Sequence, residues 1–164
     1  MSETIIAAVN VSKTYGNANA TTVALKDISL TIEKGEFVSL VGPSGCGKST
    51  LLRLIADLDT PSAGTLLVNG HAPEVARKSR EYGFVFQSPT LYEWRTVVRN
   101  AELPLEVMGR DRTDWKPRID KMLALVGLRD FHDHYPWQLS GGMQQRASIA
   151  RALSFDPAIL LMDE

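Results

Sequence analysis

The chain has 164 residues, of which 44% are hydrophobic and 23% charged, as is usual for a soluble globular protein and unlike a disordered or fibrous one. Eighteen basic and nineteen acidic residues leave a net charge of −1, which disfavours a nucleic acid partner. The single cysteine, Cys46, excludes an internal disulfide, and no apolar run approaches the roughly 18 residues of a membrane span. Met1–Asn10 lacks the features of a secretory signal, so the composition predicts a cytoplasmic protein.

The first part of the chain is predicted to form strands. Thr4–Val11 is apolar and β-branched, and Val23–Ile32 alternates imperfectly, as a strand at a sheet edge would. A turn is expected at Glu33–Glu36. The run Phe37–Val41 is almost continuously apolar, which predicts a strand buried on both faces of a parallel sheet.

A helix is predicted next, because apolar residues recur at helical spacing at Leu51, Leu52, Ile55 and Leu58. The run Pro61–Gly64 ends this helix. Strands are expected to follow at Thr65–Val68 and Gly83–Phe86, the second ending at Gln87.

The second half is predicted to be mostly helical. Its expected helices are Val97–Leu105, Arg118–Val126 and Gly142–Leu153. Pro157 ends the last of these, and Ala158–Met162 returns to strand. The pattern predicts an α/β domain with a helical insertion between about residues 88 and 155.

A glycine-rich loop lies between the predicted buried strand and the helix after it. Its residues are Gly42, Pro43, Ser44, Gly45, Cys46, Gly47, Lys48, Ser49 and Thr50, which fit the phosphate-loop pattern G-x-x-x-x-G-K-[ST]. Backbone N–H groups and the helix N-terminus would bind phosphates, Lys48 would reach the outer phosphates, and Ser49 would ligate Mg²⁺. The alternative is a glycine-rich turn without a ligand. Cys46 occupies a variable position of the pattern and is interpreted as a small filler.

Two acids follow the last predicted strand. Asp163 would face Mg²⁺ through its hydration shell, and Glu164 would orient or deprotonate the attacking water. The alternative is a core strand whose end simply meets solvent. The phosphate loop favours the functional interpretation, because both elements would end on the same edge of one sheet.

A second glycine-rich turn opens the last predicted helix. Ser140 is a candidate N-cap, and Gly141 and Gly142 would let a large ligand approach the backbone. A plain helix cap is the alternative. Since one nucleotide does not need two such helix ends in one chain, this turn is expected to face a nucleotide held by another subunit.

These motifs together resemble the ATP-binding subunits of ABC transporters, over essentially the whole chain. The loop resembles the family's Walker A, Leu139–Arg146 its signature and Ile159–Glu164 its Walker B. Gln87 matches the Q-loop glutamine, and Tyr15 matches the aromatic residue that stacks on adenine. The alternative for Tyr15 is an aromatic side chain that serves only packing.

The resemblance implies a P-loop NTPase fold: a RecA-like parallel sheet core with N-terminal antiparallel strands and a helical subdomain. The ATP-binding core would span residues 1–87 and the helical subdomain residues 88–155. Residues 156–164 would then return to the core as the Walker B strand. The resemblance further implies that two subunits enclose two ATP molecules, each between one loop and the other subunit's Ser140–Gly142 turn. The implied catalytic residues are Lys48, Gln87 and Glu164. The implied Mg²⁺ ligands are Ser49, Gln87 and Asp163.

The implied partners are a second ATP-binding subunit, integral membrane permease subunits and, indirectly, a periplasmic or extracellular solute-binding protein, with no nucleic acid. The protein would lie at the cytoplasmic face of the membrane. Leu91–Val98 and Leu103–Glu106 resemble importers of the nitrate, sulfonate and taurine type, so a small anion is the expected cargo. Trp94 lies where the family docks its permease, or is a tryptophan of the insertion packed toward its core.

The chain departs from the family pattern after Glu164, where the family continues with a D-loop, another strand and a histidine. All three histidines precede Walker B, so the sequence is expected to be part of a longer ATPase, its fold incomplete at the C-terminus. Two buried strands would then lack a neighbour and expose apolar faces.

Two other functions stay open. The chain could be a fragment that binds nucleotide without hydrolysis, or a soluble ABC protein of DNA repair or translation. Gln87 and Ser140 are 53 positions apart, too close for the long coiled coil of chromosome-organising relatives.

Overall fold

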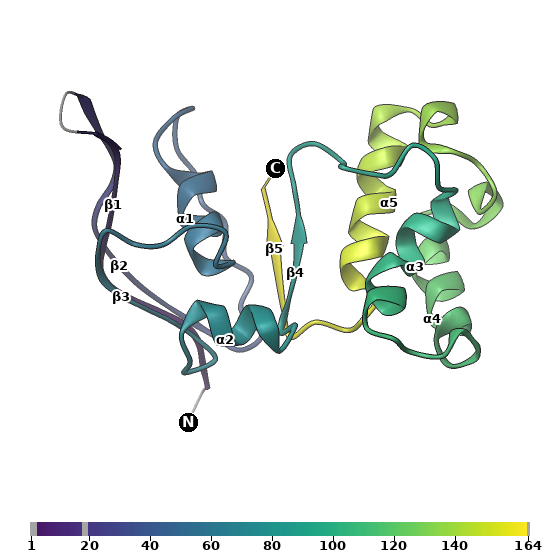
Figure 1. Ribbon diagram of the computed structural model, residues 1–164, viewed down its shortest axis with the longest axis horizontal. Helices are drawn as coiled ribbons and strands as arrows, with labels where there is room; N and C mark the ends of the chain where they lie inside the picture. The colour runs from purple at the N-terminus through teal and green to yellow at the C-terminus, as the bar shows by residue number, and fades with distance from the viewer. Residues whose placement is uncertain (1–2, 18–19, 164) are drawn as a thin grey trace. The chain divides into compact units, whose positions relative to one another are not determined.

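The structure is a computed structural model that describes residues 3–17 and 20–163. Two compact units are present: the chain up to Tyr82 together with Asp163, and Gly83–Met162. Figure 1 labels the helices and strands along the chain. Within the described ranges, none of the helices has the length and apolar character that crossing a membrane requires.

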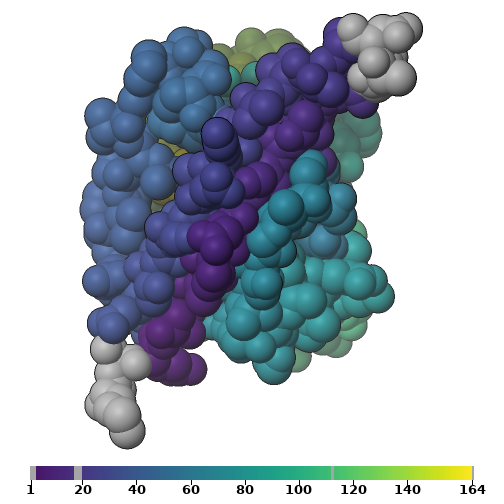
Figure 2. All heavy atoms as spheres, turned by 90° about the vertical axis from the view of Figure 1, so that its left-hand side faces the viewer, coloured from purple at the N-terminus to yellow at the C-terminus, as the bar shows by residue number. Residues whose placement is uncertain are grey.

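The first unit contains an antiparallel sheet. Its strands are β1 (Thr4–Asn17), β2 (Ala20–Glu33) and β3 (Ala63–Val68), in the order β2-β1-β3. Figure 2 looks onto this unit, with β1 in purple running diagonally across the surface. Both β1 and β2 extend beyond the ranges predicted from apolar patterning, because they pair with each other as far as Tyr15 opposite Thr22 and beyond. The predicted N-terminal antiparallel strands are confirmed.

Two helices complete this unit, α1 (Lys48–Ile55) and α2 (Pro73–Lys78). The side chains of Leu54, Val11 and Val68 are fully buried and form its core. Helix α1 ends before Leu58, whose side chain is 43% exposed, so the predicted apolar stripe extends past the helix. Helix α2 was not predicted, because its six residues are too short for a 3.6-residue period to be read.

The predicted strand at Phe37–Val41 is wrong. The segment has no regular secondary structure, and the side chains of Phe37 and Val41 are 94% and 92% exposed. A buried strand needs a hydrogen-bonding neighbour, and no strand of the described residues pairs with this segment. The apolar pattern is therefore present, but the neighbouring strands that would pair with the segment and bury it are not among the described strands.

The second unit combines two strands with helices. Strand β4 (Tyr82–Val85) pairs with β5 (Ile159–Met162), and their arrows run in the same direction in Figure 1. The helices are α3 (Val97–Val107), α4 (Arg112–Leu125) and α5 (Gly141–Leu153), with the short 3₁₀ turns Arg129–Phe131 and Pro136–Gln138 between the last two. Their buried faces meet in one apolar cluster, which includes Val97, Leu105, Trp115, Ile119, Leu123, Leu128 and Ala150.

Helix α4 begins earlier than the predicted Arg118. The Asp111 side chain caps its first turn by accepting a hydrogen bond from the Thr113 backbone N–H at 2.9 Å. Trp115, only 4% exposed, anchors the same turn in the apolar cluster. The cap and this buried ring extend the helix past Pro117, which the sequence pattern treats as its boundary.

Replacing Gly64 with alanine is expected to destabilise the first unit more than the matched change Gly70→Ala. Both glycines have positive φ, +87° and +75°, so both changes carry the left-handed strain of about 1–2 kcal/mol. Only at Gly64 would the new Cβ lie 2.3 Å from a backbone oxygen, that of Asn10, whereas Gly70 has open space. Urea unfolding of the two variants measures the difference, and equal losses of stability would contradict this reading.

Candidate functional site

The glycine-rich loop between β2 and α1 depends on glycine at specific positions. Gly45 and Gly47 have φ of +80° and +97°, which residues with a Cβ rarely adopt. A Cβ on Gly47 would also lie 2.5 Å from the Ala24 carbonyl oxygen and 2.7 Å from the Leu25 side chain. Because the backbone of β2 lies so close to position 47, only glycine fits there in this loop conformation.

Lys48 folds back over this loop. Its Nζ donates to the carbonyl oxygens of Gly42 at 2.8 Å and Pro43 at 3.0 Å, and lies 3.8 Å from Cys46 Sγ. The Cys46 thiol is free and exposed. These contacts place the ammonium group within the curve of the loop.

The N-terminus of α1 has the character of an anion site. Its N-cap is Gly47, which offers no side-chain cap, and its first turn contains no acidic residue. The first backbone N–H groups of a helix carry partial positive charge, and here the ammonium of Lys48 is added to them. The loop, the helix end and the lysine together can bind a phosphate chain.

Two predicted Mg²⁺ ligands far apart in the sequence lie in direct contact. The Ser49 hydroxyl donates to Asp163 Oδ1 at 2.7 Å, joining the first turn of α1 to the residue that follows β5. Hydroxyl and carboxylate oxygens are hard donors of the kind that Mg²⁺ prefers. No group of three or more His, Cys, Asp or Glu side chains suitable for a metal occurs in the described part of the chain. The Ser49 hydroxyl and the Asp163 carboxylate fit a Mg²⁺ ion whose other ligands would be phosphate and water oxygens.

Tyr15 belongs to a cluster with two charged residues that sequence reasoning missed. Its hydroxyl donates to Asp59 Oδ2 at 2.7 Å, and Lys13 Nζ lies 2.6 Å from Asp59 Oδ1. Hydrogen bonds from Lys13 and Tyr15 lower the pKa of Asp59 to about 2, while the bond to Asp59 raises the pKa of Tyr15. No local pattern reveals this cluster, because Asp59 follows α1 and its partners lie on β1.

The signature turn lies in the second unit, at the start of α5. The Ser140 side chain accepts a hydrogen bond from the Met143 N–H at 3.3 Å, which makes Ser140 the N-cap. Gly141 and Gly142 are exposed, and a Cβ on either would meet nothing within 4 Å. Packing within the described chain therefore does not explain why these two residues are glycine.

The segment around Gln87 is attached to α5. Gln87 is exposed and follows β4, and the side chain of Gln145 donates to the carbonyl oxygen of the preceding Phe86 at 3.0 Å. On the other side, Arg151 donates to the Thr90 and Pro89 carbonyl oxygens at 2.9 and 3.1 Å. Burial of Arg151 lowers its pKa. Sequence reasoning missed the role of Arg151, since its partners lie about 60 residues earlier.

Trp94 is a surface residue. Its side chain is 75% exposed, and its ring stacks on Tyr92 with centroids 4.8 Å apart. The loop that carries it is fixed by Asn100, which is fully buried and donates to the carbonyl oxygens of Tyr92 and Arg95. The alternative of a tryptophan packed toward the core does not hold.

The predicted site residues therefore fall into two groups. The first unit contains the loop Gly42–Thr50, Tyr15 and Asp163, and joins Asp163 directly to Ser49 of the loop. The second unit joins the Gln87 segment to the helix that begins after Ser140. The predicted catalytic residue Glu164 lies outside the described residues. The loop, the lysine and the helix end have the arrangement of the P-loop class, which can bind phosphate.

Known proteins resemble the chain over almost its whole length. A family model described as ABC transporter matches residues 25–164. An uncharacterized ABC transporter ATP-binding protein of Methanocaldococcus jannaschii, MJ1508, is 46% identical and aligns with 98% of the chain. A taurine import ATP-binding protein, TauB, of Yersinia pestis is 50% identical and aligns with 86% of the chain. A methionine import ATP-binding protein, MetN, of Corynebacterium efficiens is 48% identical and aligns with 94% of the chain.

The fold is also that of a solved cassette. The dimeric structure of MJ0796, a bacterial ABC transporter cassette, matches 98% of the chain with a TM-score of 0.87 and 40% identity. A second MJ0796 structure, described as a post-hydrolysis state bound to ADP and Pi, matches with a TM-score of 0.86. The chain belongs to the ABC transporter family, as one of its ATP-binding cassettes. It spans 75% of MJ1508 and 74% of the MJ0796 chain, but only 54% of TauB and 45% of MetN.

Proposed function

We propose that this protein binds and hydrolyses MgATP as the ATP-binding subunit of an importer. The observation that carries the proposal is the contact between Ser49 and Asp163 at the N-terminus of α1, beside Lys48. Phosphate would bind the loop amides and Lys48, and Mg²⁺ would be held by Ser49, Asp163 and Gln87. The ion would neutralise charge on the transferred phosphoryl group. Gln87 and Glu164 would orient the attacking water, and Tyr15 would stack on the adenine.

The active form would be a head-to-tail dimer. In it, Ser140, Gly141 and Gly142 of one subunit would contact the phosphates held by the loop of the other. The proposal is supported by the exposed, unobstructed backbone of this turn and by the dimeric state of the MJ0796 cassette. ATP would act as a conformational switch, because it favours the closed pair over the open one.

The membrane partner would be a permease at the cytoplasmic face, served by a solute-binding protein on the other side. The stacked rings of Tyr92 and Trp94 provide exposed aromatic area for such a contact. Beside them, a cavity of about 490 Å³ is lined mostly by apolar side chains, among them Phe84, Phe86, Leu103 and Phe155. A small anion such as a sulfonate or nitrate is the proposed cargo, supported by the 50% identity to TauB.

Calorimetric titration of the full chain with Mg²⁺ and a non-hydrolysable ATP analogue tests this function. Binding accompanied by dimer formation is expected, and ATP turnover should accompany it when ATP replaces the analogue. Absence of heat from a chain that circular dichroism shows to be folded would overturn the proposal. Binding without turnover would instead support the nucleotide-holding fragment, and co-purification with nucleic acid would support a soluble, non-transport ABC protein.

A further inference from the structure

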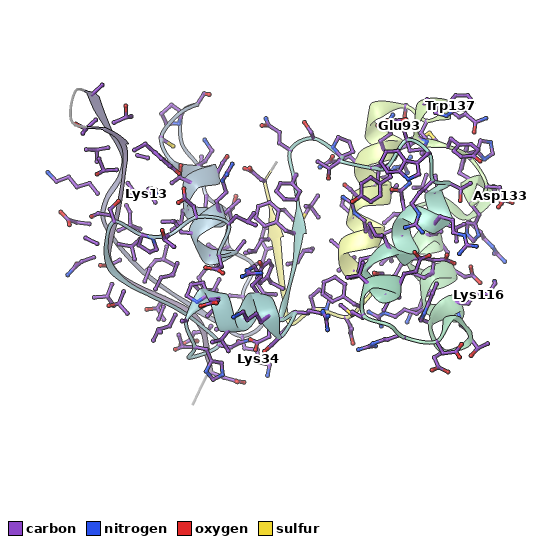
Figure 3. The ribbon with its side chains drawn as sticks, in the orientation of Figure 1. Lys13, Lys34, Glu93, Lys116, Asp133 and Trp137 are labelled. Atoms are coloured by element: carbon purple, nitrogen blue, oxygen red, sulfur yellow. The ribbon has the colours of Figure 1, made fainter. Side chains whose placement is uncertain are left out.

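A largely buried ion pair, Lys13–Asp59, contacts Tyr15. The side chains of Lys13 and Asp59 are only 11% and 20% exposed, and their charged atoms are 2.6 Å apart. Lys13 Nζ also donates to the Thr60 carbonyl oxygen at 2.8 Å. Both oxygens of the Asp59 carboxylate are hydrogen-bonded: Oδ1 accepts from Lys13 and from the Thr60 backbone N–H, and Oδ2 accepts from the Tyr15 hydroxyl. Figure 3 labels Lys13 on β1.

These contacts determine how the ring of Tyr15 lies. The Lys13 ammonium sits over one face of the ring, 4.8 Å from its centroid, in the geometry of a cation–π interaction. The hydroxyl is held at the ring edge by Asp59, to which it donates at 2.7 Å. Yet 39% of Tyr15 stays exposed. A stacking partner must therefore use the face opposite the ammonium.

The turn that carries Asp59 is also fixed by contacts that do not involve this carboxylate. The Ser62 backbone N–H donates to the Ser12 carbonyl oxygen at 2.8 Å, and the Thr14 N–H donates to Ser62 Oγ at 3.1 Å. The turn thus stays attached to β1 when the Asp59 carboxylate is altered. The carboxylate itself accepts from Lys13, from the Tyr15 hydroxyl and, at 2.8 Å, from the Thr60 backbone N–H, and an asparagine oxygen at this position can still accept from Thr60.

We propose that Lys13 and Asp59 are positioning residues for recognition of the nucleotide base, because together they hold the Tyr15 ring with one face covered and the other available for stacking. This inference rests on the proposed ATP binding and adds two residues to its base-binding part. A pre-ordered ring loses little side-chain entropy when a base stacks on it. The two residues should therefore contribute to the affinity for the base and not to that for the phosphates, which bind the loop.

The test compares Mg-ATP with Mg-tripolyphosphate, which lacks the base, by calorimetry on the full chain. The change Asp59→Asn keeps the shape of the side chain and removes its charge. It should lower the affinity for Mg-ATP about three- to tenfold and change the affinity for tripolyphosphate less than about twofold. Tyr15→Phe removes only the hydroxyl anchor and should show the same selectivity. In the double variant the loss should be smaller than the product of the single losses, since both changes break one interaction. Lys34→Met, which removes the exposed Lys34–Glu3 ion pair at the ends of β1 and β2, serves as the control and should bind both ligands normally.

Equal weakening of both ligands by Asp59→Asn would overturn the inference, since it would indicate general damage to the loop. Unchanged Mg-ATP affinity, or fully multiplicative losses in the double variant, would overturn it too. If Asp59→Asn fails to fold, Tyr15→Phe alone decides by the same comparison. Failure of the unaltered chain to bind either ligand would overturn the proposed function itself, whereas binding without any difference between variants overturns only this inference.

Discussion

Replacing Lys48 with alanine is expected to lower ATP hydrolysis by about 10²–10³-fold, the cost of removing one positioned electrostatic contact to a developing charge. Lys48 Nζ lies within the loop, held by the carbonyl oxygens of Gly42 and Pro43. The same ammonium would reach the outer phosphates once ATP is bound. Steady-state release of phosphate by the purified full chain, at saturating Mg-ATP, is the measurement.

The matched control for this change is Lys34→Ala. Lys34 lies in the same unit and pairs with Glu3, with side chains 65% and 69% exposed, so its removal should leave turnover and folding nearly unchanged. Circular dichroism and thermal melting establish that both variants are folded. A Lys48→Ala protein that hydrolyses ATP at the rate of the unaltered chain would exclude the proposed site.

Leu123→Ala is expected to destabilise the second unit by about 2–5 kcal/mol. The Leu123 side chain is fully buried in the cluster where α4 meets α3 and α5, together with Ile119 and Leu128. Removing its methyl groups loses apolar burial and leaves a cavity that rigid helices fill only in part. Urea unfolding followed by the fluorescence of the chain's tryptophans reports the change.

Leu125→Ala on the same helix is the control. Leu125 is 69% exposed, and alanine is at least as good a helix former, so the change should cost less than about 0.5 kcal/mol. If the two variants unfolded at the same urea concentration, the second unit would not depend on this core. The pair separates burial from helix propensity because residue type, helix and substitution are the same.

The cap at Ser140 and the loop were predictable because their chemistry is local. Ser140 followed by two glycines predicts a helix start within a few residues, and the structure places the cap there. The phosphate loop is likewise recognised from nine consecutive residues, since its glycines, lysine and hydroxyl act through their immediate neighbours. The start of α4 was not predicted: the helix begins at a local cap on Asp111, but burial of Trp115, a tertiary effect, stabilises the residues before Pro117 as helix.

The sequence by itself therefore determined the family, the order of the motifs, the phosphate loop and most helices, because these depend on residues close together in the chain. Only the tertiary structure decided that Ser49 meets Asp163, that Lys13 and Asp59 hold Tyr15, and that Phe37–Val41 lies exposed. Contacts between distant residues depend on how strands pair and helices pack. An apolar run forms a buried strand only where another strand lies beside it, and apolar patterning alone does not reveal that neighbour.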